Sequence, residues 1–176
     1  MPQQSVCGTT AGSSGPVAIA APAMTGGRLM IAFTVPGAPQ GKGRAKIVKI
    51  GGFSRMATPA KTVAYEGLIA LAAQRAMAGG QMLTSAVGCN VFIDAPVPES
   101  WSGRKQRMAL AGEVLPTTKP DADNVVKAVF DGLNGVLWRD DVLVVDLRVR
   151  KRYAATPCVR VEVWALDEPV QREIAA

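Results

Sequence analysis

Two segments near the C-terminal end of this chain alternate apolar and polar residues, and this alternation constrains the fold more than any other feature. Val145, Leu147 and Val149 alternate with charged residues within Val142–Arg150, and Val159–Trp164 repeats the pattern. A period of two residues is typical of β-strands that turn one face towards a core. Since only Lys151–Pro157 separates them, we expect the two strands to form a hairpin.

The remaining chain supplies further strands. Leu29–Val35 is rich in strand-forming residues and ends at a Pro-Gly turn, and Val87–Ala95 reads as a second strand of this kind. Ala45–Ile50 can pair across Gly51-Gly52 as a hairpin, which would form a flexible basic arm.

Two helices are expected. The first is opened by Thr58 as N-cap and Pro59 as first helical position, and it stops at Gly79-Gly80. Its apolar stripe is expected at Ala64, Leu68, Leu71 and Ala72. The second helix is expected over Asn124–Leu133. The long polar stretch Pro96–Pro120 is expected to be a loop, and loops of that length are usually functional or mobile.

These elements predict one small α/β domain with a mixed sheet of about four strands and two main helices, since 176 residues fit one domain. Residues 1–28 hold no aromatic residue and a single charge, and we expect a disordered tail or a working start at Met24 or Met30. The folded domain is expected over 29–166, followed by a C-terminal tail at 167–176.

The composition excludes several classes of enzyme. The chain has no histidine, so it cannot use a Ser-His-Asp or Cys-His mechanism or a His-containing zinc site. The cysteines, at 7, 89 and 158, are too few and scattered for a disulfide framework and suit a reducing cytoplasmic setting. No apolar run reaches the roughly 18 residues of a membrane span. The net charge of +6 favours an anionic partner.

Carboxylates cluster in one region of this basic chain. The segment Lys119–Lys127 reads KPDADNVVK, and Asp131 and Asp140-Asp141 follow it. Asp121 and Asp123 are spaced to point at one position, and the turn at Asn134-Gly135 can bring Asp141 beside them. Three converging carboxylates without histidine predict a site for Mg²⁺ or Mn²⁺. Lys127, one turn after Asp123, would hold a water or offset charge on the phosphate.

Each of these residues also has a simpler interpretation. Asp123 alone is more often an N-cap, Asp131 is expected to pair with Lys127, and Asp140 is expected to be a solvated turn residue. A bare Asp-x-Asp is also used by nucleotide-sugar transferases, although a chain of this size has no room for the nucleotide-binding domain of such an enzyme.

The motif resembles the RusA family of Holliday-junction resolvases. The resemblance rests on the Asp-x-Asp-Asn-x-x-Lys run with its distant Asp-Asp pair, together with these residues: Lys119-Pro120, Asp131, Leu133, Gly135, Trp138 and Val144–Val149. It implies a homodimeric, Mg²⁺-dependent endonuclease that cuts four-way DNA junctions by paired nicks and works at the nucleoid. By motif position, Asp121, Asp123 and Asp141 would be metal-binding catalytic carboxylates and Lys127 the catalytic lysine. Many members carry Gln where this chain has Leu143.

A partner dense in phosphate needs basic contacts, which weaken with salt. The expected DNA contacts are Lys42, Arg44, Lys46, Arg104, Lys105, Arg107 and Lys119. Trp101 is a candidate for stacking on an unpaired base, or else for anchoring its loop. A junction-binding protein with an inactive site is the main alternative function.

Overall fold

Seven strands and three main helices make up the domain. The computed structural model describes residues 23–25, 28–50 and 52–166. The strands are β1 (Ala23–Thr25), β2 (Arg28–Pro36), β3 (Lys46–Ile50), β4 (Phe53–Ala57), β5 (Val87–Pro96), β6 (Val144–Ala154) and β7 (Cys158–Ala165). The helices are α1 (Ala60–Met77), α2 (Gly103–Leu110) and α3 (Ala122–Leu133), with the 3-10 helix η1 (Asp141–Leu143). Apart from β1 and Arg28, the expected tails 1–28 and 167–176 lie outside the described residues.

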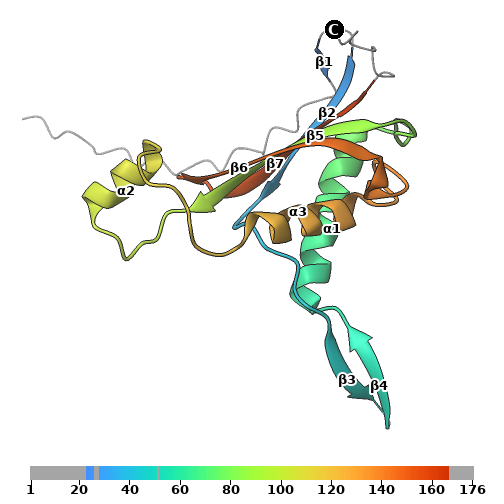
Figure 1. Cartoon of the computed structure of the whole chain (residues 1–176), viewed down its shortest axis with the longest axis horizontal. Helices are drawn as coiled ribbons and strands as arrows, with labels where there is room; N and C mark the ends of the chain where they lie inside the picture. The colour runs from blue at the N-terminus through green and yellow to red at the C-terminus, as the bar shows by residue number, and fades with distance from the viewer. Residues whose placement is uncertain (1–22, 26–27, 51, 167–176) are drawn as a thin grey trace, which may run out of the picture.

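The main sheet is mixed and has the strand order β1-β2-β7-β5-β6, in which only β5 and β6 are parallel. The expected α/β domain with a mixed sheet is confirmed, with four long strands and the short β1 at one edge. The β3–β4 hairpin expected across Gly51-Gly52 is also confirmed, and it projects away from the sheet as an arm (Figure 1).

The hairpin expected between the two C-terminal strands is wrong. β5 lies between β6 and β7, parallel to the first and antiparallel to the second. Most of β5 is buried, including both faces near Cys89 and Asp94. A strand buried this thoroughly is stabilised by a neighbour on each edge, and the chain supplies these neighbours by passing from β6 across the end of β5 into β7.

Helices α1 and α3 pack on one face of the sheet (Figure 1), and the core fills the space between. The face of α1 that turns inwards differs from the expected one. Leu68 and Leu71 are 50% and 43% exposed, and the buried residues are Thr62, Tyr65, Ile69, Ala73 and Ala76. The helix is apolar on almost every side, so its sequence pattern leaves its rotation open.

The crossing of α3 over α1 fixes that rotation. A Cβ at Gly132 would lie 2.8 Å from the backbone oxygen of Glu66 and 2.9 Å from Cβ of Ile69. The absence of a side chain at Gly132 therefore lets the two helices approach closely with Ile69 turned towards α3. The start of α1 is also one residue later than expected, because Pro59 is the N-cap and no side chain caps the helix.

The stretch expected to be a long loop contains a helix. α2 starts after Ser102, whose hydroxyl accepts a hydrogen bond from the Lys105 amide at 3.4 Å. Trp101 packs edge-on against Tyr153 of β6, with 5.3 Å between ring centroids, and the Lys105 ammonium lies 3.8 Å from the Trp101 ring centre. Trp101 thus anchors α2 to the end of the sheet, which was one of its two expected roles.

Candidate active site

The N-terminal end of α3 presents the two leading carboxylates of the motif. Asp121 occupies the N-cap position in an extended conformation, and its side chain makes no capping hydrogen bond. Asp123 lies in the first turn, where the helix dipole favours negative charge. Lys127 Nζ lies 3.3 Å from Oδ2 of Asp123, and both side chains are exposed. The structure therefore pairs Lys127 with Asp123 across one turn, as their spacing predicts.

The segment from Gly41 to Gly43 crosses the ends of both long helices. The Lys42 amide donates to the Asn124 carbonyl at 2.9 Å, and the Gly43 amide donates to Oγ1 of Thr62 at 3.1 Å. A Cβ at Gly41 would lie 3.0 Å from Cβ of Asn124, and one at Gly43 would lie 2.7 Å from Oγ1 of Thr62. Glycine at both positions therefore lets this segment pass close to α3 and α1.

Lys42 is placed by this crossing among carboxylates. Its ammonium group pairs with Asp131 of α3 and lies 4.0 Å from Oε1 of Glu66 on α1. The expected pair between Asp131 and Lys127 is therefore wrong, because Lys42 pairs with Asp131 and Lys127 pairs with Asp123. Phosphate binding by Lys42 stays a prediction, and Lys42 already has acidic partners within the chain.

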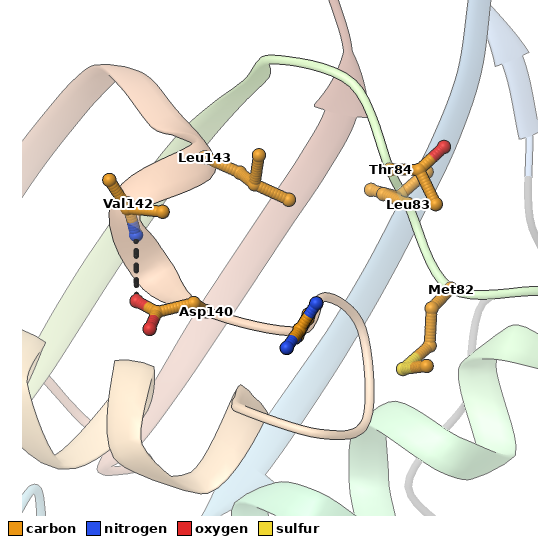
Figure 2. A pocket seen from close by; sticks show the side chains of 7 residues that line it. Met82, Leu83, Thr84, Asp140, Val142 and Leu143 are labelled. Atoms are coloured by element: carbon orange, nitrogen blue, oxygen red, sulfur yellow. Dashed lines mark hydrogen bonds between the residues drawn. The ribbon is translucent and has the colours of Figure 1, made fainter.

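The Asp140-Asp141 pair reaches α3 at a different point from the one expected. Oδ1 of Asp140 accepts the Val142 amide at 3.1 Å and caps η1 (Figure 2). Burial raises the pKa of Asp141, and the neighbouring carboxylates of Asp140 and Asp131 raise it further. Beside this turn lies a mostly apolar pocket, which is lined by Met82, Leu83, Thr84, Arg139, Asp140, Val142 and Leu143.

The expected convergence of Asp121, Asp123 and Asp141 is not found in the described part of this single chain. No group of three His, Cys, Asp or Glu residues there is placed to hold one metal ion. Asp141 approaches Asp131, which is eight residues beyond Asp123 and so roughly 12 Å further along the helix axis. The turn at Asn134-Gly135 returns the chain along α3, but it does not carry Asp141 back to the start of the helix.

The donor chemistry nevertheless fits a hard cation. All candidate ligands are carboxylate oxygens, which Mg²⁺ and Mn²⁺ prefer. After burial, the carboxylates of Asp140 and Asp131 contribute to the raised pKa of Asp141, so negative charges lie close together there. A divalent cation bound there would lower that repulsion.

Glu66 belongs to the same cluster and was missed by the sequence analysis. Its Oε1 is buried and has no hydrogen-bond partner among the described residues. Burial raises the pKa of Glu66, the Lys42 charge lowers it, and Asp131 raises it. One signal was available, because Glu66 is the first acidic residue in a chain whose preceding charges are all basic.

The expected DNA-binding residues lie on three separate elements. Lys46 is exposed on the projecting β3–β4 hairpin, and Arg44 is exposed on the segment leading into it (Figure 1). Arg104, Lys105 and Arg107 are exposed on α2. Lys119 lines a shallow pocket together with Gly41, Lys42, Pro120, Asp121 and Asn124. Of the expected DNA-binding residues, Lys42 and Lys119 therefore lie beside the start of α3, and the others lie on separate elements.

A further basic surface was missed. The face of the sheet opposite α1 and α3 carries Arg148, Arg150 and Arg152 of β6, in register with Asn90, Phe92 and Asp94 of β5. Arg160 of β7 lies over the Phe92 ring at 4.9 Å on this face. The alternating charges of β6 were visible in the sequence, but its place beside β5 was not.

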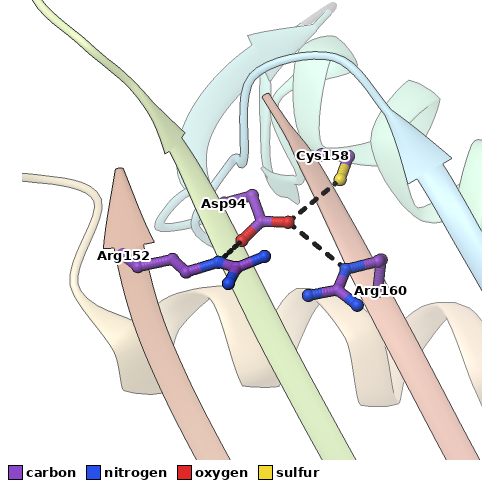
Figure 3. A network of polar contacts seen from close by, with 4 residues as sticks. All are labelled: Asp94, Arg152, Cys158 and Arg160. Carbon is purple, nitrogen blue, oxygen red and sulfur yellow. Dashed lines mark hydrogen bonds and ion pairs between the residues drawn. The ribbon is translucent and has the colours of Figure 1, made fainter. Parts of the chain in front are cut away.

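Asp94 organises the end of this basic face (Figure 3). It is 4% exposed, and its carboxylate accepts hydrogen bonds from Nε of Arg152 at 2.7 Å and Nε of Arg160 at 3.3 Å. The Cys158 thiol also lies 3.4 Å from Oδ2 of Asp94. These contacts tie β5 to the strands on both of its sides.

Comparison with known proteins agrees with this arrangement. The family model of endodeoxyribonuclease RusA matches residues 36–164, from the end of β2 to β7. The chain belongs to the RusA endodeoxyribonuclease family. It is also 38% identical over 135 residues to the uncharacterized protein YqaN of Bacillus subtilis (strain 168), covering 76% of this chain and 94% of YqaN.

Membership of the RusA family indicates a nuclease that acts on DNA, and the matched region contains the whole carboxylate cluster. RusA proteins are, in general, divalent-metal-dependent endonucleases for branched DNA junctions. This RusA-family chain has no helix, among its described residues, that is long and apolar enough to cross a lipid bilayer.

Proposed function

We propose that this chain is an Mg²⁺-dependent endodeoxyribonuclease that resolves four-way DNA junctions by paired, symmetric nicks and acts as a homodimer in recombination and repair. The observation that carries the proposal is the RusA match over residues 36–164, which includes the Asp-x-Asp-Asn-x-x-Lys motif at the start of α3. Binding of Mn²⁺ in place of Mg²⁺ is compatible with the same oxygen donors.

In this proposal Asp121, Asp123 and Asp141 are the metal ligands by their place in the family motif. Since Asp141 lies nearer Asp131 in the single chain, its turn would have to move towards the start of α3 when the ion binds. The bound ion would polarise a phosphate and lower the pKa of a water. Lys127, 3.3 Å from Asp123, offsets negative charge at the start of α3 and orients the Asp123 carboxylate. Lys42 pairs with Asp131 and so holds the segment that leads into the β3–β4 hairpin against α3. Phosphate contacts come from Lys42, Arg44, Lys46, Arg104, Lys105, Arg107 and Lys119.

The test uses a labelled synthetic four-way junction and a linear duplex of the same sequence, each with Mg²⁺ or EDTA. We expect symmetric nicks in the junction alone, dependent on Mg²⁺. Asp123→Asn should abolish cutting and leave binding in Ca²⁺ unchanged, because the substitution removes a metal ligand and keeps the shape of the side chain. Glu99→Gln, an exposed change on the segment between β5 and α2, is the matched control. Cutting by Asp123→Asn at the wild-type rate would contradict the assigned role.

A second candidate is a junction-binding protein without cleavage. It is favoured by one observation, namely that the described residues of the single chain do not gather three carboxylates around one point. Tight junction binding without nicks in either Mg²⁺ or Mn²⁺ would support it. The transferase alternative has no support from the RusA match.

A further inference from the structure

The outer edge of β6 is the most open part of the main sheet. β6 is the last strand in the order β1-β2-β7-β5-β6, and no strand among the described residues pairs with its outer side. Residues 145 to 150 are all exposed, which is six consecutive positions on both faces of one strand. An open edge of this length can add a strand from another chain.

Three apolar side chains are left open on this strand. Val145, Leu147 and Val149 are 66%, 42% and 40% exposed. Leu147 and Val149 are in register with the buried residues Cys89 and Val91 of β5, so they continue the core face of the sheet. Helices α1 and α3 cover β2, β7 and β5 but do not bury this last apolar row. An apolar row that continues the core and remains exposed is typical of an interface.

We propose that the outer edge of β6 joins two copies of this chain, with β6 antiparallel to β6 of the second copy about a two-fold axis at Leu147. The inference rests on the homodimer of the proposed function and specifies the surface and the register through which it forms. An interface about a two-fold axis must complement itself, because the same surface is used by both copies.

The charges on β6 select this register. Side chains that oppose each other across two paired strands lie on the same face of the sheet. Each alternative register therefore moves the two-fold axis by one whole residue along β6. Centred on Leu147, the pairing places Asp146 opposite Arg148 of the second copy twice, Val145 opposite Val149 twice, and Leu147 opposite itself. An axis at Asp146 places Asp146 opposite itself. An axis at Arg148 places Asp146 opposite Arg150 twice but also Arg148 opposite itself, and directly opposed like charges are destabilising. The axis at Leu147 pairs opposite charges without opposing any like charges.

The neighbours of β6 at its two ends limit where a second copy can pair with it. On one side, η1 ends at Leu143 and the strand begins at Val144. On the other side, the Lys151 ammonium bonds to the Thr118 carbonyl, and α2 packs near Tyr153. The exposed stretch of β6 is residues 145–150, so an axis near the middle of this stretch, close to Leu147, uses most of it. The exposed length places the axis close to Leu147, and the charges then choose the register.

Pairing in this way would join the two sheets into one sheet of twice the width. Since the axis is perpendicular to the sheet, the helices of both copies lie on one face. The arginine-bearing faces then lie together on the other face, with the Asp146–Arg148 pairs along the seam.

The test is the oligomeric state, measured by sedimentation velocity and light scattering without DNA or metal. We expect a wild-type dimer. Asp146→Arg and Arg148→Asp should each raise the dimer dissociation constant at least about tenfold, because each creates two like-charge pairs. The double variant should restore the dimer, and so should an equimolar mixture of the two single variants. Arg150→Asp, which faces Val144 in this register, is the matched control and should change the constant by less than about threefold.

The outcomes separate this interface from the proposed function. A monomeric wild-type chain, or a dimer unaffected by both single reversals, would overturn the interface. Rescue of Asp146→Arg by Arg150→Asp instead of by Arg148→Asp would overturn the register. A dimer that behaves as expected but does not cut junctions would refute the nuclease and leave the interface intact. All substituted residues are exposed, and circular dichroism checks that each variant is folded.

Discussion

Asp94 shows how the sheet stabilises a charged residue at a nearly buried position. Burial raises the pKa of Asp94. Hydrogen bonds from Arg152 and Cys158, together with the charges of Arg152 and Arg160, lower it by more than burial raises it, so the pKa of Asp94 lies below its usual value. A carboxyl whose pKa is depressed by folding contributes stability above its unfolded pKa of about 4. That contribution is lost as the pH falls through the folded pKa.

Substitution of Asp94 by Asn should therefore have an effect that depends on pH. At pH 7 we expect Asp94→Asn to lower the free energy of unfolding by about 1–2 kcal/mol, a moderate value because the Arg152 and Arg160 side chains are 55% and 39% exposed to solvent. Below pH about 4 the difference from wild type should narrow. Urea unfolding at several pH values measures it, and a difference that stays constant from neutral to acidic pH would contradict this account.

The pair between Lys42 and Asp131 can be tested by a double-mutant cycle. Lys42→Met leaves the Asp131 and Glu66 carboxylates without their cation, and we expect a loss of about 1 kcal/mol in the free energy of unfolding. The Lys42→Met, Asp131→Asn double variant should lose less than the sum of the single changes, because no unpaired carboxylate remains at Asp131. Strict additivity would show that the pair contributes nothing.

The crossing of α1 and α3 makes a prediction about whole elements. Gly132→Ala should lower the free energy of unfolding by about 1–3 kcal/mol, because its Cβ would press against the backbone of α1. Gly67→Ala on α1 is the matched control, since a Cβ there meets nothing within 4 Å. This control should raise stability by about 0.5–1 kcal/mol through helix propensity. Thermal unfolding of both variants shows whether close packing or helix propensity dominates the effect of a Cβ at Gly132.

The projecting β3–β4 hairpin should act as an electrostatic arm. The double variant Lys46→Gln, Lys49→Gln should weaken junction binding in Ca²⁺ and reduce the dependence of binding on salt. With fewer phosphate contacts, fewer counterions are released from the DNA on binding. Arg75→Gln, at the far end of α1, removes a charge away from the arm and serves as the control. An unchanged salt dependence in the Lys46, Lys49 variant would exclude the arm from the DNA interface.

Elements set by local chemistry were predictable from the sequence. The β3–β4 hairpin follows from its Gly-Gly turn, and β2 follows from its strand-forming residues and Pro-Gly end. The β6–β7 pairing was predicted wrongly, because the insertion of β5 between them depends on contacts distant in sequence. In the site, the order of Asp121, Asp123 and Lys127 could be read from the sequence. Lys42, however, reaches Asp131 through the crossing of Gly41–Gly43, and Glu66 reaches it through the packing of α1 on α3.

At the scale of the whole molecule, the proposed dimer makes a prediction about how many DNA strands are cut in one encounter. A cruciform in a supercoiled plasmid disappears after one nick, because the nick releases the superhelical tension. Two coupled sites should therefore give linear plasmid, while a monomer should give nicked circles. We expect Asp146→Arg to convert linear product into nicked product, and the Asp146→Arg, Arg148→Asp double variant to restore it. Linear product from a variant shown to be monomeric would contradict coupling through β6.

The Lys105 ammonium over the Trp101 ring gives the molecule a built-in optical reporter. A phosphate bound at α2 would draw this ammonium from the indole, and the emission of Trp101 would change with DNA and return with salt. Trp138 is fully buried and donates its indole N–H to Asn134 at 2.7 Å, so its emission should remain steady until the domain unfolds. One tryptophan would then follow the ligand and another the fold, and no dye would have to be attached.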